Sequence, residues 1–219
     1  KFGFGLASGQ ADAAVLRAAA SPAIDLVGLH AHIGSQVFDA EFFEMAIEVM
    51  APFLQKHQLP EFSVGGGLGV AYVAGEEAAS ITEWGEVVRA ACAAAGITAH
   101  VTAEPGRALV AQAAITLYSV GTIKEIPDIR TYVSVDGGMS DNARPALYDA
   151  EYFAVLANRT STSANSNSRL VGKHCETGDI VISEIDLPAD IAPTDLIAVP
   201  ATGAYGRSMA SNYNHVPKP

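Results

Sequence analysis

The feature that most constrains this chain is the regular alternation of helical and extended segments over its first hundred residues. Apolar residues at helical spacing, and a capping box formed by Ser80 and Glu83, indicate three helices separated by short apolar runs. The expected helices are residues 10–20, 40–57 and 80–96, and the expected strands are residues 24–33, 62–64 and 97–103. Strands and helices that alternate at this spacing predict a parallel sheet or barrel made of βαβ units.

The pattern changes near residue 110, after which helical periodicity is scarce. Extended runs are expected at residues 113–126, 130–136, 179–185 and 196–200. We therefore expect two domains, with residues 1–112 forming part of a barrel and residues 113–219 forming a mainly β region. The polar stretch at residues 158–168 predicts a solvated loop.

Charge and composition exclude several classes of protein. The chain has 13 basic and 24 acidic side chains and a net charge of −11, which disfavours binding to nucleic acid. No apolar run reaches the roughly 20 residues that a membrane-spanning helix needs, and the first residues, KFGFGLASGQ, lack the pattern of a signal peptide. Two cysteines cannot make a disulfide framework, so we expect a cytoplasmic globular protein.

The ends of the predicted strands carry residues suited to chemistry. His30 and His32 stand two apart on a strand, which fits either a metal site or histidines satisfied within the core. The glycines of residues 65–69 expose backbone N–H groups that suit a phosphate, although a tight turn explains them equally well. Glu104 follows the third strand within Glu-Pro-Gly-Arg, a sequence typical of a turn.

Arginines and one cysteine add further candidates in the second half of the chain. The guanidinium groups of Arg107, Arg144 and Arg207 match a phosphate or a carboxylate, although a surface ion pair is the simpler reading of Arg107. Cys175 is flanked by polar residues and could act as an acid, a nucleophile or a metal ligand. Cys92 lies in an alanine-rich helical run and is expected to be a packing residue.

Six segments, taken in order, resemble the fold type III pyridoxal-phosphate (PLP) decarboxylases, and their diaminopimelate branch most closely. They are HAHIGSQ (30–36), VGGGLG (64–69), AEPGR (103–107), SVDGGMSDNARPALYDA (134–150), CETGD (175–179) and GAYGRSMASNYN (203–214). The resemblance implies an α/β fold, with a partial (β/α)8 TIM barrel followed by a mainly β C-terminal domain. It also implies decarboxylation of meso-diaminopimelate to L-lysine and CO2 in lysine biosynthesis.

The resemblance also assigns roles to individual residues. Glu104 would pair with the pyridine nitrogen of PLP, His32 would stack on its ring, and Cys175 would protonate the carbanion after decarboxylation. The residues implied to bind the cofactor are His32, Ser35, Gly65, Gly66, Gly67, Glu104, Arg107 and Tyr205. Those implied to bind substrate are Arg107, Arg144, Tyr148, Glu176 and Tyr205. Cys175 and Glu176 would come from a neighbouring subunit, which implies a homodimer with shared active sites. The resemblance implies no metal site.

One expected part is missing, namely the lysine that links PLP covalently to the enzyme. None of the five lysines has the Tyr-Ala-x-Lys context of the family, and Lys1 is a poor substitute. We therefore expect the chain to be a fragment that is inactive and folds poorly by itself. Three alternatives stay open: an ornithine-, arginine- or carboxynorspermidine-type decarboxylase, a non-catalytic PLP-binding relative, and a metal hydrolase built on His30 and His32.

Overall fold

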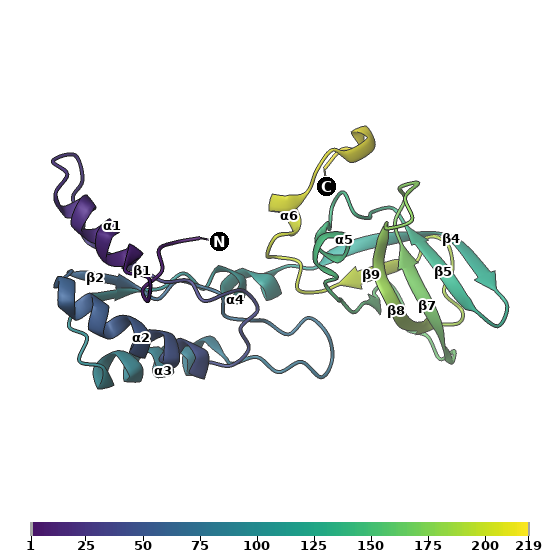
Figure 1. Ribbon diagram of the computed structural model, residues 1–219. Coiled ribbons are helices and arrows are strands. Elements are labelled where there is room, and N and C mark those ends of the chain that lie inside the picture. Colours follow the sequence, from purple (N-terminus) through teal and green to yellow (C-terminus); the bar gives the residue numbers. More distant parts are fainter. Residues whose placement is uncertain (1, 219) are drawn as a thin grey trace. The chain divides into compact units, whose positions relative to one another are not determined.

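The computed structural model describes residues 2–218, and the chain divides into two compact units. The first unit contains the residues up to Gly69 together with Ala78–Gly106. The second unit contains Val70–Glu77 and the residues from Arg107 onward. Each unit has its own sheet, and the two sheets differ in kind (Figure 1).

The first unit is built from parallel strands that alternate with helices. Its sheet has the order β1-β2-β3 and both strand pairs are parallel. The strands are β1 (Gly28–His30), β2 (Glu61–Ser63) and β3 (His100–Thr102), and the helices are α1 (Gln10–Ala19), α2 (Glu41–His57) and α3 (Ile81–Ala94). The predicted βαβ order is therefore present, although β1 and β3 are much shorter than the apolar runs that indicated them.

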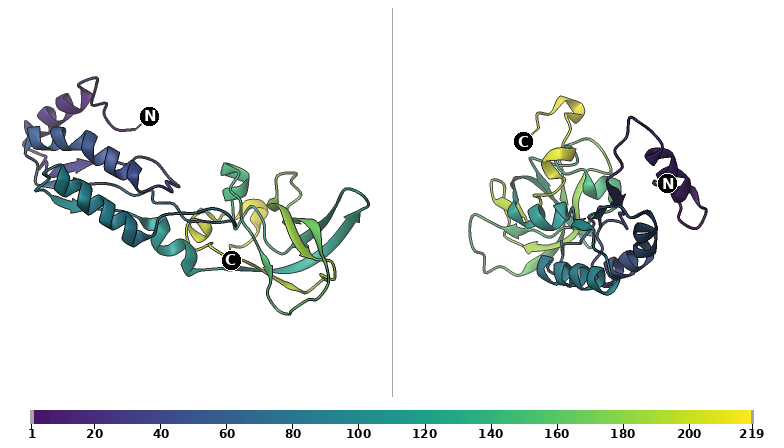
Figure 2. Two further views of the ribbon diagram at one scale, coloured as in Figure 1. Left: turned by 90° about the horizontal axis from the view of Figure 1, so that it is seen from below. Right: turned by 90° about the vertical axis from the view of Figure 1, so that its left-hand side faces the viewer.

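Helices α2 and α3 lie side by side on one face of this sheet (Figures 1 and 2). Phe43 of α2 meets Trp84 of α3 edge to face at 5.5 Å between ring centroids, and both side chains are buried. The predicted capping box begins α3: the Glu83 N–H donates to Ser80 Oγ at 3.1 Å, and the Ser80 N–H donates to Glu83 Oε2 at 2.8 Å. Cys92 packs within α3 as expected and is 7% exposed.

The backbone ladder continues past the carboxyl ends of the strands. The Ala31 N–H donates to Ser63 O at 3.0 Å, and the Glu104 N–H donates to Gly65 O at 2.8 Å. Segments that follow three different strands are thereby tied together at one edge of the sheet. In barrel enzymes the site is built at this edge.

The second unit is organised around a six-stranded sheet with the order β6-β9-β4-β5-β7-β8. Its strands are β4 (Thr116–Ile126), β5 (Arg130–Val135), β6 (Val155–Leu156), β7 (Asn165–Val171), β8 (Ile180–Pro188) and β9 (Leu196–Val199). The pairs are antiparallel except for β5 with β7. Short helices join the strands: α4 (Gly106–Val110), η1 (Ala111–Ala113), α5 (Arg144–Tyr148), α6 (Gly206–Met209) and η2 (Tyr213–His215).

The prediction that residues 158–168 form a solvated loop is wrong at its C-terminal end. Strand β7 begins at Asn165, and Ser168 is only 1% exposed. The Ser168 hydroxyl can be buried because it donates to Ser166 O at 3.2 Å. Leu170 of the same strand is buried, and β7 pairs with β5 on one side and β8 on the other. These tertiary contacts outweigh the polar composition of residues 158–168.

The prediction for residues 113–126 also needs correction at its start, because η1 occupies residues up to Ala113 and β4 begins at Thr116. The Glu-Pro-Gly-Arg turn likewise passes directly into α4, which begins at Gly106. Within residues 2–218 no helix combines the length and the apolar character that crossing a membrane requires.

Candidate active site

A carboxylate and two imidazoles gather at the carboxyl edge of the first unit's sheet. Ser63 Oγ donates to Glu104 Oε1 at 3.0 Å, and His30 Nε2 lies 3.4 Å from Glu104 Oε2. The Ser63 hydrogen bond is the main cause that lowers the pKa of the Glu104 carboxyl, and the charge and hydrogen bond of His30 lower it further. Glu104 is therefore ionised at neutral pH and stays ionised to a more acidic pH than an ordinary glutamate, ready to accept a hydrogen bond.

His32 is held by a backbone donor from the glycine-rich segment. The Gly66 N–H points at His32 Nδ1 at 3.3 Å, which makes Nδ1 an acceptor and places the proton of the neutral ring on Nε2. The rings of His30 and His32 are nearly parallel, with centroids 6.5 Å apart and planes inclined by 4°. Next to the carboxylate of Glu104, the sheet edge thus carries a flat imidazole whose orientation is fixed.

The glycines of residues 65–67 are required by close backbone contacts. A Cβ on Gly65 would lie 2.3 Å from Ala31 O, and one on Gly66 would lie 2.1 Å from Glu104 O. A Cβ on Gly67 would lie 2.1 Å from Gly34 O, and Gly67 also has a φ of +107°. Any larger residue would push the neighbouring segments apart.

Two of the three glycine amides already have partners within the first unit. The Gly65 N–H donates to Ser63 Oγ at 3.2 Å, and the Gly66 N–H faces His32. These amides therefore order the segment that carries the site residues. The suggestion that the glycine backbone holds a phosphate stays a prediction.

Gly66→Ala is expected to destabilise the first unit by about 1–3 kcal/mol, because overpacking a close backbone contact forces the neighbouring chain to shift. The unfolding midpoint of the whole protein in urea measures this cost. The matched control is Gly85→Ala in α3, where a Cβ meets nothing within 4 Å and alanine favours the helix. Equal stability of the two variants would contradict the packing argument.

Ser63→Ala is expected to raise the pKa of Glu104, because it removes the donor that contributes most to lowering it. The carboxylate then takes up its proton at a higher pH, so the acid limb of any activity that needs the ionised form moves upward. A 13C NMR titration of the glutamate carboxyl groups measures the change. Ser134→Ala, which removes a hydroxyl bonded to Thr122 O, is the control, and a Glu104 pKa that stays put would overturn the assignment.

In the second unit, arginines and tyrosines form a compact cluster. Arg107 Nη1 donates to the Tyr72 hydroxyl at 2.8 Å, and its Cζ lies 4.7 Å from the centroid of the Tyr205 ring. Arg144 is 6% exposed and its Nη1 donates to the Tyr152 hydroxyl at 2.5 Å. Its Cζ lies 4.4 Å from the centroid of the Tyr72 ring. Three of the residues predicted from the sequence thus meet around two tyrosines that the sequence did not single out.

The loop that carries Cys175 and Glu176 is organised by a buried carboxylate. Asp179 is 3% exposed and accepts the backbone N–H groups of Met139 at 2.6 Å and His174 at 2.7 Å. Its contacts bring the loop against the Gly138–Met139 turn. Cys175 is exposed and free, and Glu176 accepts a hydrogen bond from the Tyr213 hydroxyl, which raises the pKa of Tyr213.

The predicted site residues lie in both units of the chain. His32, Gly65–Gly67 and Glu104 share one edge in the first unit, and Ser35 lies in the segment between β1 and α2. Arg107, Arg144 and Tyr205 share the cluster in the second unit, whereas Tyr148 at the end of α5 is 66% exposed. The residues missed were Ser63, Tyr72, Tyr152 and Asp179. Ser63 and Asp179 stood inside or beside quoted motifs, but no pattern marked the tyrosines.

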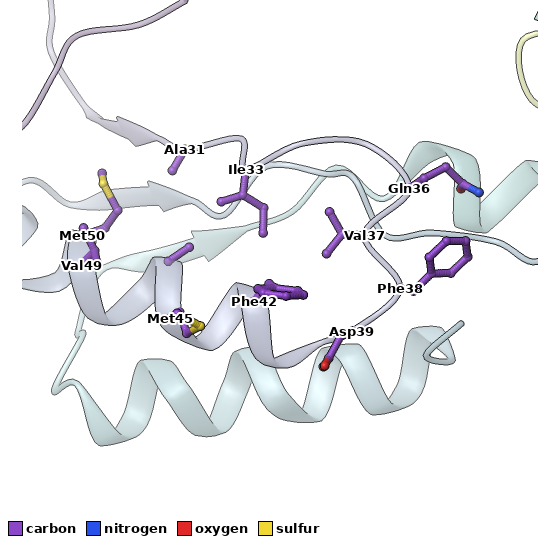
Figure 3. Close-up of a pocket in the computed structure, with 11 residues that line it drawn as sticks. Ala31, Ile33, Gln36, Val37, Phe38, Asp39, Phe42, Met45, Val49 and Met50 are labelled. Carbon is purple, nitrogen blue, oxygen red and sulfur yellow. The ribbon is translucent and has the colours of Figure 1, made fainter. Parts of the chain in front are cut away.

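An apolar hollow of about 710 Å3 lies elsewhere in the first unit, between α2 and the segment after β1 (Figure 3). Its lining includes Phe42, Met45 and Val49, which are 54%, 58% and 64% exposed. Apart from Gln36 and Asp39 the lining is apolar, and it contains none of the predicted site residues. The hollow therefore bears on association and solubility rather than on the chemistry.

Val49→Lys is expected to reduce self-association of the isolated chain, because it places a charge in this exposed apolar face. Sedimentation velocity at several concentrations measures the monomer fraction, which should rise severalfold. Glu44→Lys, on the same helix but outside the hollow, is the control. If both variants associate as the unsubstituted chain does, the face is not responsible.

The alternative of a metal hydrolase on His30 and His32 has no ligand set in the part of the chain that the structure describes. In residues 2–218 no three histidine, cysteine or carboxylate side chains come together in a way that could hold a metal ion. His30 is instead directed at Glu104.

Comparison with known proteins identifies the family of the chain. The model of the pyridoxal-dependent decarboxylase family, specifically its pyridoxal binding domain, matches residues 1–111. The chain belongs to the pyridoxal-dependent decarboxylases. The matched residues include the carboxyl edge that holds His32 and Glu104.

The curated proteins similar to this chain include diaminopimelate decarboxylases. That of Corynebacterium efficiens is 46% identical over 100% of this chain and 51% of its own length. That of Bacillus subtilis is 43% identical over 100% of the chain and 52% of its own length. The chain therefore spans about half the length of the curated relatives it matches.

Solved structures of diaminopimelate decarboxylases match the decarboxylase chain in fold. The enzyme from M. jannaschii matches with a TM-score of 0.92 and 30% identity, over 100% of this chain and 51% of the other. The enzyme from Helicobacter pylori complexed with L-lysine matches with a TM-score of 0.84 and 33% identity, over 94% of this chain and 52% of the other. The predicted fold class, barrel βα units followed by a mainly β region, is confirmed.

Proposed function

We propose that the whole protein decarboxylates meso-diaminopimelate to L-lysine and CO2 with PLP as cofactor. The observation that carries the proposal is 43–46% identity to diaminopimelate decarboxylases over the whole chain or nearly all of it. Related structures complexed with L-lysine, the product of this reaction, support the same substrate. The glutamate after Cys175 also favours it over an ornithine-type substrate.

The chemistry of the first unit's donor set fits PLP. An ionised Glu104 can accept a hydrogen bond from a protonated pyridine nitrogen, and the oriented ring of His32 offers a flat face. When bound, PLP withdraws electrons from the carbon that loses CO2. The residues proposed to hold it are His32, Ser35, Gly65, Gly66, Gly67, Glu104, Arg107 and Tyr205.

Arginines, tyrosines and Glu176 are proposed to supply the groups for the substrate. The guanidinium groups of Arg107 and Arg144 suit its carboxylates, and Glu176 suits its distal ammonium group. Tyr148 and Tyr205 complete the proposed substrate contacts. Cys175 Sγ would donate a proton to the carbon that has lost CO2, which its exposure permits.

The assembly is proposed to be a cytoplasmic homodimer in which Cys175 and Glu176 act in the partner's site. Residues 1–112 and 113–219 are the proposed domains. Because none of the five lysines has the family context, the lysine that links PLP is proposed to lie outside this sequence. Lys1, the one lysine near a family segment, lies outside the described residues.

The deciding experiment supplies the purified, PLP-loaded whole protein with meso-diaminopimelate, ornithine, arginine or carboxynorspermidine and follows release of CO2 and amine. We expect L-lysine from diaminopimelate at a kcat/KM at least 100-fold above that for the others. Preference for another substrate would replace the substrate assignment. PLP binding without turnover of any substrate would favour a non-catalytic relative. Mixing two inactive variants, Glu104→Gln and Cys175→Ala, should restore activity only if subunits share sites.

A further inference from the structure

We propose that Tyr152 and Tyr72 are positioning residues, which fix the guanidinium of Arg144. The guanidinium can then bind the substrate carboxylate that is not lost as CO2 and remains in the product. This inference rests on the proposed function, because it assumes an amino-acid substrate whose second carboxylate stays in place. It adds two residues that neither the sequence motifs nor the comparisons assign.

The first support is the way in which the charge of Arg144 is compensated. Arg144 is 6% exposed, and in residues 2–218 no carboxylate forms an ion pair with it. Its charge is met by the Tyr152 hydroxyl oxygen at 2.5 Å and by the Tyr72 ring, whose centroid is 4.4 Å from Cζ. A phenol and a ring face stabilise a cation without cancelling it, so the guanidinium keeps a full positive charge for an anionic ligand.

The two tyrosines also fix each other. Their rings meet edge to face, with centroids 5.2 Å apart and planes inclined by 79°. Burial raises the pKa of Tyr152, so its hydroxyl stays neutral and leaves the charge of Arg144 intact. The Tyr72 hydroxyl accepts from Arg107 Nη1 at 2.8 Å, so one side chain contacts both arginines.

The side-chain amide of Asn142, two residues before Arg144, also favours an anionic ligand at this place. Asn142 is 5% exposed, and its Oδ1 accepts the Arg144 backbone N–H at 3.4 Å. Its Nδ2 is buried and makes no hydrogen bond of ordinary geometry with the described residues, although the Asn142 side chain interacts with the Tyr152 hydroxyl. A buried N–H group without a well-placed acceptor is costly, and an anionic ligand beside Arg144 would supply one.

The test uses the PLP-loaded whole protein and two competitive inhibitors that differ only in a carboxylate, L-lysine and 1,5-diaminopentane. Tyr152→Phe should weaken inhibition by L-lysine and raise the KM for diaminopimelate, each by roughly three- to tenfold, and leave kcat within about twofold. Inhibition by 1,5-diaminopentane should not change. A general structural disturbance would weaken both inhibitors alike and overturn the proposal.

Two further variants separate the contacts of Tyr72. Tyr72→Phe removes the hydroxyl that Arg107 uses and keeps the ring over Arg144, whereas Tyr72→Leu removes both. The leucine variant should therefore lose more affinity for L-lysine than the phenylalanine variant. Tyr118→Phe, which removes a buried hydroxyl bonded to Asp141, is the control and should leave both inhibition constants unchanged.

A second measurement distinguishes failure of this inference from failure of the proposed function. If the unsubstituted protein neither decarboxylates diaminopimelate nor binds L-lysine, the proposed function is wrong. NMR of the arginine Nη–Hη groups then tests the positioning by itself, because a guanidinium held by Tyr152 rotates slowly. Slow rotation that is lost in Tyr152→Phe supports the positioning, and rotation unchanged by the substitution overturns it.

Discussion

Replacing Glu104 with glutamine should lower kcat/KM for diaminopimelate by about 100-fold or more, which is the usual cost of removing one oriented electrostatic group from a site. The carboxylate is oriented by Ser63 and His30, and its lowered pKa keeps it charged. Glutamine preserves the size of the side chain but cannot hold a protonated pyridine nitrogen by charge. Steady-state rates of the PLP-loaded whole protein measure the loss.

The matched control is Glu61→Gln. Glu61 is an exposed residue at the start of the three-residue strand β2, at the end opposite to Ser63. The Glu61→Gln enzyme should keep its activity within about twofold of the unsubstituted enzyme, as surface substitutions commonly have small effects. A Glu104→Gln enzyme that also works within threefold of the unsubstituted rate would remove Glu104 from the site.

Cys175→Ala should lower kcat by about 100-fold, the lower range for loss of a positioned proton donor, while the affinity for PLP stays nearly unchanged. Cys175 is exposed on a loop that Asp179 holds by two backbone hydrogen bonds, so alanine should leave the loop in place. Product analysis adds a second readout, because a misplaced proton yields by-products instead of L-lysine.

Cys92→Ala is the control for the cysteine variant. Cys92 is buried in α3, and burial raises the pKa of its thiol, so it is poorly suited to proton transfer. Its replacement should cost some stability and leave kcat unchanged. Loss of PLP from the Cys175→Ala enzyme, with unchanged turnover of the molecules that still hold it, would show that Cys175 has a different role.

The sequence predicted the elements whose signals are local. Capping by Ser80, the amphipathic face of α2 and the glycine-terminated strands all depend on residues near one another in the chain. Strand β7 was missed because its polar residues are stabilised by pairing with β5 and β8, which no local pattern reveals. The lengths of β1 and β3 were overestimated because apolar residues also continue into the neighbouring loops.

The site residues also divide into those with a local sequence signal and those without one. Motif residues such as His32 and Glu104 were predicted because they lie at the ends of expected strands, in segments that resemble the family. Tyr72 and Tyr152 were not, because their relation to Arg144 exists only once distant segments meet. Asp179 lay inside a quoted motif, but its backbone partners Met139 and His174 depend on the fold.

The contacts of Gly65, Gly66 and Gly67 have a consequence for how motion spreads through the first unit. Each glycine abuts a carbonyl oxygen of another segment, at Ala31, Glu104 and Gly34 respectively. With no side chain between them to yield, we expect a displacement of the segment that bears Glu104 to be transmitted to the segment that bears His32. Main-chain contact, rather than side-chain packing that could relax, then limits how far the two segments can move apart.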